Sequence, residues 1–144
     1  MESSTPWRDT AWAMSEENVE LVKDAFSRWN AGERTFADEI HPDVEILSRG
    51  LMEGRRLRGR EGVRRWFREV DEQFDEWTLT MEEWRDAGDC VVALGQAHMH
   101  GRESGITFDQ PVGWLFEIRD GQVFRLETFL DDPNEALKAA GLSE

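Results

Sequence analysis

The histidines are the first residues whose type and spacing could support chemistry. His98 and His100 lie two positions apart, so on a strand both rings would project from the same face. Such a pair could transfer protons or bind a metal ion. A metal site needs a third ligand, and His41 and Asp109 are the only suggestive candidates, although no spacing ties them to the pair. We therefore expect no metal site and retain His98 as a candidate acid or base, while an exposed strand explains the pair equally well.

Gln110 and several aromatic residues form a second group of candidates. In the run from Ile106 to Ile118, Gln110 has the parity of Trp114, so both side chains would point to the same side of a sheet. Aromatic rings can clamp a flat ligand or pack as ordinary core. Arg125 and Glu127 have the opposite parity to their neighbours and are expected to point outward. The candidate ligand-binding residues are Trp29, Trp114, Phe26, Thr128 and Leu126.

Charge is unevenly distributed along the chain. Eight arginines lie between Arg49 and Arg68 against two glutamates, although the whole chain carries a formal charge of −14. The arginines could attract an anionic ligand, or they could form a solvated face in which glutamates one helical turn away pair with them. The overall negative charge repels phosphate backbones, so we expect no nucleic-acid partner.

Length and composition indicate one domain, because 144 residues suffice for a single core. No apolar run approaches the roughly 20 residues that cross a bilayer, so we expect no membrane partner. The first 14 residues lack the basic and then apolar order of a secretory signal. Cys90 is the only cysteine, which excludes an internal disulfide and suits a reducing compartment. We expect a cytoplasmic protein.

Helical periodicity appears in four places. Ser15 is a suitable N-cap for a helix that ends at Gly32, and its apolar stripe is Val19, Val22, Phe26 and Trp29. Residues 35–40 indicate a short second helix. A third helix begins at Arg60, with one apolar side made of Val63, Trp66, Phe67, Val70 and Phe74. Residues 134–140 indicate a last helix.

Strands are predicted at residues 43–47 and, after the third helix, at 77–85, 91–100, 106–118 and 123–130, with turn signals between them. A loop rich in glycine and arginine follows the first strand. This order predicts an α+β fold, a cone in which a curved antiparallel sheet and three to four helices enclose a pocket. We divide the chain into a flexible N-terminal tail, residues 1–14, and a cone domain, residues 15–144.

These segments together resemble the SnoaL-like proteins, a branch of the nuclear transport factor 2-like superfamily that includes ketosteroid isomerases, polyketide cyclases and limonene epoxide hydrolases. The resemblance spans residues 15–142. It rests on SEENVELVKDAF, HPDVEI, RGREGVRRWF, DAGDCVVALG, SGITFDQPVGWLFEIRDGQVFRLETFLD and EALKAAGL. It implies a largely apolar cavity and a homodimer formed through the convex face of the sheet.

The resemblance places the family's catalytic positions on residues that cannot take the same roles. The general base of the ketosteroid isomerases falls on Ser48, and their protonated acid falls near Trp114. The water-activating groups of the limonene epoxide hydrolases fall near Ala97, Gly95 and Thr128. None of these residues is a carboxylate.

Two hypotheses about function follow. The first is an enzyme, an isomerase, cyclase or hydrolase, that acts on a small hydrophobic substrate without a metal or an organic cofactor and uses His98, Gln110 and Ser48 as polar groups. The alternative is a non-catalytic module that binds a hydrophobic ligand, or a dimeric interaction domain. The missing carboxylates favour the non-catalytic binding module.

Overall fold

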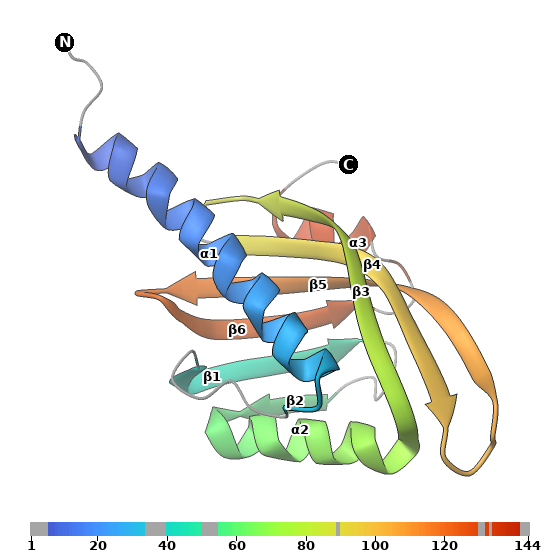
Figure 1. Ribbon diagram of the computed structural model, residues 1–144. Helices are drawn as coiled ribbons and strands as arrows, with labels where there is room; N and C mark the ends of the chain where they lie inside the picture. Colours follow the sequence, from blue (N-terminus) through green and yellow to red (C-terminus); the bar gives the residue numbers. More distant parts are fainter. Residues whose placement is uncertain are drawn as a thin grey trace.

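The computed structural model describes residues 6–33, 40–49, 55–88, 90–129, 132 and 134–141. The chain is an α+β protein, as predicted, in which six strands form one curved sheet that does not close into a barrel (Figure 1). The elements in chain order are α1 (Pro6–Asn30), β1 (Ile40–Arg49), β2 (Arg55–Arg58), α2 (Gly59–Gln73), β3 (Phe74–Asp86), β4 (Cys90–Gly101), β5 (Thr107–Arg119), β6 (Gln122–Phe129) and α3 (Asn134–Ala139). No helix in these residues has the length and apolar character needed to cross a membrane.

The strand order in the sheet is β2-β1-β6-β5-β4-β3. The β3, β4, β5 and β6 strands are joined by antiparallel pairings, as predicted, and β1 also pairs with β2 in antiparallel fashion. The pairing of β1 with β6 is parallel, and it was not anticipated. Residues 55–58, which were assigned to a loop, form the edge strand β2 beside β1.

The first helix differs most from the prediction. α1 begins at Pro6, so the expected start at Ser15 was too late and Ser15 lies inside the helix rather than at its N-cap. The helix ends near Gly32, where a positive φ of 99° marks the expected stop. The short helix predicted at residues 35–40 falls outside the described residues, except for Ile40, which belongs to β1.

Two apolar clusters pack on opposite faces of the sheet. The larger cluster lies between the sheet and the helices α1 and α2, and it includes Trp114 and Phe116 of β5. The smaller one contains Leu115 of β5 together with Leu137 of α3. Because neighbouring strand residues face opposite sides, α3 covers the outer face of the sheet, whereas all helices were expected on the inner face (Figure 1).

The long strands bring the β4–β5 turn close to the end of α2. The backbone N–H of Arg102, directly after β4, donates to the carbonyl oxygen of Gln73, the last residue of α2, at 2.9 Å. The curvature of the sheet visible in Figure 1 therefore places this turn beside the helix layer.

Candidate functional site

A continuous cluster of aromatic rings fills the space between the helices and the inner face of the sheet. We call it the aromatic layer, and it consists of Phe26, Trp29, Trp66, Phe67, Trp77, Trp84, Trp114 and Phe116. Trp114 lies at its centre, since its ring centroid is 5.1 Å from that of Phe26 and 5.6 Å from those of Trp29 and Trp66. Most of these contacts are edge-to-face or tilted, the arrangements that aromatic pairs favour.

The sequence explains why rings from four elements meet here. The stripe on α1 presents Phe26 and Trp29, which are both buried, as the periodicity predicted. The stripe on α2 presents Trp66 and Phe67. Strand parity directs Trp114 inward, where it contacts rings from both helices.

Two indole N–H groups in the aromatic layer lack a hydrogen-bond acceptor. Among the described residues, nothing accepts from Nε1 of Trp66 or from Nε1 of Trp114, and these two side chains are 5% and 3% exposed. Trp77 differs, because its Nε1 donates to Asp71 Oδ1 at 2.7 Å. The indole N–H groups of Trp66 and Trp114 are therefore available to an acceptor within the layer.

A groove of about 480 Å³ lies on the side of α2 that faces the β4–β5 turn. It is lined by Arg64, Phe67, Arg68, Asp71, Glu72 and Arg102. Phe67 also belongs to the aromatic layer, where its ring contacts those of Trp29 and Trp77. The groove therefore reaches the layer at Phe67.

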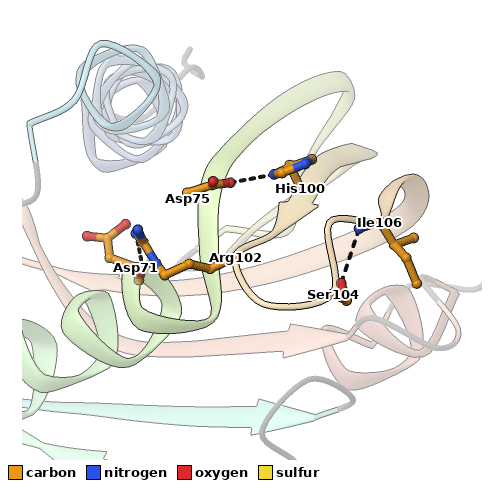
Figure 2. A network of polar contacts seen from close by, with 6 residues as sticks. All are labelled: Asp71, Asp75, His100, Arg102, Ser104 and Ile106. Atoms are coloured by element: carbon orange, nitrogen blue, oxygen red, sulfur yellow. Dashed lines mark hydrogen bonds and ion pairs between the residues drawn. The ribbon is translucent and has the colours of Figure 1, made fainter.

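The charges in the groove nearly balance. Arg102 is held in place, because its Nε and Nη2 donate to the carbonyl oxygen of Asp71 at 3.2 and 2.7 Å (Figure 2). Arg64 pairs with Glu61 at 3.0 Å. Arginines and carboxylates together give the groove polar walls around an apolar floor, without a strong preference for anions.

Both histidines of β4 lie on the outer face of the sheet, away from the aromatic layer. Their neighbours Ala97 and Met99 belong to the inner cluster, so His98 and His100 point the other way. His98 Nδ1 is 2.7 Å from Asp109 Oδ1, and these side chains are 47% and 69% exposed. The role of His98 in acid–base chemistry stays a prediction, but the site would be a surface pair.

His100 pairs with Asp75 of β3 at 2.6 Å (Figure 2). The strand register shifts between Phe74 and Glu76, and this irregularity at Asp75 turns its carboxylate outward to His100. The hydrogen bond from His100 lowers the pKa of Asp75 below its usual value, and the charges of His100 and Arg102 act in the same direction. Among the described residues no group of three or more histidine, cysteine, aspartate or glutamate side chains could hold a metal ion.

Gln110, Leu126 and Thr128 lie on or near the inner face. Gln110 is half-buried and has the parity of Val112, which belongs to the inner cluster. Leu126 and Thr128 of β6 are buried at 1% and 2% exposure, and Leu126 packs in the same cluster. Ser48 pairs with Thr128 in the parallel β1–β6 register, and its side chain lies outside the described part of the structure.

The α2 helix contributes Trp66 and Phe67 to the aromatic layer. The sequence placed Trp66 on the apolar stripe of α2, and its burial in the inner cluster confirms this position. Phe67 follows Trp66 on the same apolar stripe, so the sequence indicates that both rings face the core. The sequence could not show which elements lie close together, because only the fold shows that Trp66 of α2 contacts Trp114 of β5.

Comparison with known proteins places the chain in a family. Residues 22–126 match the model of the SnoaL-like domain, and the chain belongs to this family. This confirms the resemblance drawn from the sequence. A search of curated proteins finds no match.

Solved structures with the same fold are numerous, and all those compared in detail are distant in sequence. TerC, co-crystallised with polyporic acid, has a TM-score of 0.72 and 22% identity, over 80% of this chain and 92% of TerC. An NTF2-like protein of unknown function from Burkholderia pseudomallei has a TM-score of 0.74 and 18% identity, over 85% of this chain and 95% of its own.

A hypothetical protein with a ketosteroid isomerase-like fold from Catenulispora acidiphila, in complex with trimethylamine, is similar to the same degree. Its TM-score is 0.70 at 18% identity, over 85% of this chain and 93% of its own. At these identities the likeness establishes the fold, which agrees with the SnoaL-like and NTF2-like assignment.

Proposed function

We propose that this protein binds a flat, hydrophobic small molecule against the aromatic layer. The observation that carries the proposal is the convergence of buried rings from α1, α2, β3 and β5 on Trp114 and its neighbours. Small-molecule sites are mostly apolar and aromatic, with a few polar groups that orient the ligand. The aromatic layer has this composition, with the open N–H groups of Trp66 and Trp114 as its polar part.

The groove beside α2 is the proposed route to the layer. Its volume of about 480 Å³ falls within the range of roughly 300 to 1,000 Å³ typical of ligand pockets. Its apolar lining residue, Phe67, is shared with the aromatic layer. The Phe67 ring contacts those of Trp29 and Trp66, so a ligand in the groove would meet the layer at this ring.

Two similar structures support a small organic ligand. TerC was co-crystallised with polyporic acid, and the protein from Catenulispora acidiphila was solved with trimethylamine. Both compounds are small organic molecules, although neither identifies the ligand of this chain.

The types of the buried polar residues favour ligand binding without catalysis. The buried polar residues of the described chain are Asn18, Glu127 and Thr128, and Glu127 has the outward parity of Phe129, which belongs to the outer cluster. No buried carboxylate or histidine of the described residues therefore has the inward parity of the layer. Proton transfer in an apolar site requires a titratable group of this kind.

A cofactor-independent isomerase, cyclase or hydrolase is the second candidate function. Gln110 favours it, because its inward parity would bring an amide to the edge of the inner face. An amide can polarise a carbonyl group but cannot serve as a base near neutral pH.

The test is direct titration with fluorene, a flat tricyclic hydrocarbon, by isothermal titration calorimetry. We expect saturable binding of one molecule per chain, and we expect Trp114→Ala to weaken it at least tenfold, since the ring is central to the layer. Ile106→Ala is the matched control, because Ile106 is 60% exposed on the turn before β5. Absence of saturable binding by the wild-type protein would refute the proposal.

Enzyme activity is tested separately with a panel of epoxides, ketosteroids and polyketide-like enones. Turnover that persists in a His98→Ala, Gln110→Ala, Ser48→Ala triple variant would remove these residues from a catalytic role. Turnover that is lost would restore the enzyme as the first candidate.

Two further properties stay proposals. A homodimer is proposed from the family resemblance, and sedimentation velocity would report it. A cytoplasmic location is proposed from the single free cysteine, and fractionation of cells that express the protein would test it.

A further inference from the structure

A pair of histidines lies on the outer face of the sheet, opposite the aromatic layer. His98 and His100 of β4 both project from this face. Strand geometry places their Cα atoms about 6.6 Å apart, which is twice the rise of one strand residue. Each imidazole ring extends well beyond its Cα atom, and a Zn–N bond adds about 2 Å to this reach. Two rings at this spacing can therefore share one metal ion.

Each of the two rings has one nitrogen held by a carboxylate. Nδ1 of His98 is 2.7 Å from Asp109 Oδ1, and Nδ1 of His100 is 2.6 Å from Asp75 Oδ1 (Figure 2). An ionised carboxylate only accepts hydrogen bonds, so the proton of each neutral ring resides on Nδ1. The lone pair is then on Nε2, and neither Nε2 has a hydrogen-bond partner among the described residues.

The two carboxylates lie on opposite sides of β4. Asp109 belongs to β5 and Asp75 to β3, the two strands that flank β4 in the sheet. The two nitrogens of an imidazole ring point away from each other. A ring whose Nδ1 faces β5 therefore directs Nε2 back across β4, and a ring whose Nδ1 faces β3 does the reverse. Both lone pairs are directed towards the space between the rings.

This arrangement is the one that metal-binding histidines have in proteins. A ligating imidazole almost always donates its other ring N–H to a carboxylate, a backbone carbonyl or water, which fixes the ring and raises the basicity of the ligating nitrogen. The third histidine of the chain differs. Nδ1 of His41 accepts from the backbone N–H of Asp43 at 2.9 Å, and no carboxylate of the described residues pairs with this ring.

The charges around the pair favour a cation. The chain has a formal charge of −14. Glu76, which pairs with His100 in the strand register, is exposed on the same face. Arg102 is the arginine whose charge acts on Asp75. Three carboxylates, those of Asp75, Glu76 and Asp109, therefore surround the pair against one guanidinium group.

We propose that His98 and His100 bind one divalent transition-metal ion through their Nε2 atoms, while Asp109 and Asp75 hold the two rings in position. Nitrogen ligands favour Zn²⁺, Ni²⁺ and Cu²⁺ over Mg²⁺ and Ca²⁺, which take oxygen ligands. The expectation of no metal site rested on the missing third ligand, and the described residues supply none. A site of two histidines completed by water does not need one. It lies on the face opposite the aromatic layer and is independent of the proposed function.

The test is titration of the full-length protein with zinc chloride by isothermal titration calorimetry, at a slightly alkaline pH where imidazole is neutral. We expect saturable binding of one ion per chain. His98→Gln and His100→Gln should each weaken it at least tenfold, because the second ligand on a shared strand acts at a high effective concentration. His41→Gln is the matched control and should bind like wild type. Cys90→Ser, which removes the only thiol, should do so as well.

Two further variants test the positioning role of the carboxylates. Asp109→Asn and Asp75→Asn should each weaken zinc binding about tenfold, because each removes a carboxylate that holds a ligating ring. Glu76→Gln is the matched control for charge. It removes one negative charge from the same face and leaves both contacts of the rings in place, so its effect should be at most about twofold, as expected for a screened surface charge.

Nuclear magnetic resonance of the ¹⁵N-labelled histidine rings identifies the ligating atoms without any substitution. Zinc should shift the Nε2 signals of His98 and His100, leave their Nδ1 atoms protonated and leave the signals of His41 unchanged. Absence of saturable zinc binding by the wild-type protein overturns the proposal. So does binding that survives both histidine substitutions, or a spectrum that places the ion on Nδ1 or on His41. Because the spectrum needs no variant, the proposal remains testable if a substitution prevents folding.

Discussion

At the residue scale, the acidic partner of His100 shows how a local irregularity of a strand determines electrostatics. Asp75 would point inward with Trp77 if β3 were regular, but the register shift beside Phe74 directs it to His100 on the outer face. The pKa of Asp75 is lowered chiefly by this hydrogen bond. The ionised carboxylate is therefore favoured in the folded state.

This pair makes stability depend on pH in acid solution. A carboxyl group whose pKa is lower in the folded than in the unfolded state contributes stability above about pH 4, and the contribution is lost as pH falls through the folded value. We expect Asp75→Asn to lower the thermal unfolding midpoint at pH 6, with the difference from wild type shrinking as the pH falls towards 2. Glu76→Gln, an exposed neighbour, should show no such trend. A difference that stays constant over this range would contradict the prediction.

Gly95 of β4 lies where the backbone of β3 approaches most closely. A Cβ atom at this position would collide with the carbonyl oxygen of Thr80 and lie 2.7 Å from Cα of Met81. We expect Gly95→Ala to reduce the free energy of unfolding by about 3 kcal/mol, because backbone atoms must shift to make room. Urea unfolding measures the change, with Gln96→Ala, an exposed neighbour, as the control. A loss below about 0.5 kcal/mol, the range of ordinary surface substitutions, would disprove the close approach.

Parity in the sequence placed individual side chains well where strands are regular. It put Trp114 and Leu126 on the inner face and Arg125 on the outer face, and all three are so placed. It could not decide which face the pair His98 and His100 occupies, because parity relates residues within a strand without saying which side is the core. The open donors of Trp66 and Trp114 were also beyond reach, since they depend on what surrounds each ring in three dimensions.

At the element scale, local patterns predicted the four long strands and α2, but not the long-range pairing of the first strands. The residue types Asp120 and Gly121 predicted the turn between β5 and β6. Both residues adopt positive φ, at 52° and 75°, as a tight hairpin turn requires. The parallel pairing of β1 with β6 joins residues about 80 positions apart, and no local signal encodes it. The four-residue strand β2 was hidden in a segment rich in glycine and arginine.

The position of α1 depends on one polar anchor at its end. Asn30 Nδ2 donates to the carbonyl oxygen of Leu79 at 2.7 Å, and the N–H of Leu79 donates to Asn30 Oδ1 at 2.9 Å. This two-point contact joins the helix that carries Phe26 and Trp29 to β3. It makes the orientation of the aromatic layer sensitive to a residue outside the layer.

Substitution of this anchor tests the connection. We expect Asn30→Ala to lower the free energy of unfolding by about 2 kcal/mol, because it leaves two part-buried backbone groups of Leu79 without partners. It should also weaken fluorene binding several-fold, since the end of α1 loses its fixed position. Glu20→Ala, an exposed change on the same helix, should alter neither quantity by a measurable amount. If Asn30→Ala destabilises the protein and leaves the fluorene affinity unchanged, the contact of Asn30 with Leu79 does not influence the binding site.

At the scale of the whole molecule, one sheet supports two apolar clusters on its two faces. In β5, Leu115 packs in the outer cluster under α3, while its neighbours Trp114 and Phe116 pack in the aromatic layer. The sequence predicted the last helix closely, at residues 134–140 against Asn134–Ala139. It did not show which face α3 covers, because a helix of six residues has too short a stripe to specify its partner. The shared strands nevertheless couple the two faces mechanically.

This coupling predicts that the chain unfolds as one unit, and Leu137→Ala tests it from the face opposite the site. Leu137 of α3 is 3% exposed and packs in the outer cluster, so its truncation should lower the free energy of unfolding by about 2 kcal/mol. Tryptophan fluorescence reports the inner layer, and far-ultraviolet circular dichroism reports the whole backbone. Because both faces use β4 and β5, the two signals should shift to the same lower urea midpoint, as a two-state transition requires.

Lys138→Ala, on the exposed side of α3, should leave both midpoints in place. A fluorescence transition that keeps its wild-type midpoint while the dichroism signal shifts would show that the aromatic layer is stable without α3 and that the two faces unfold independently.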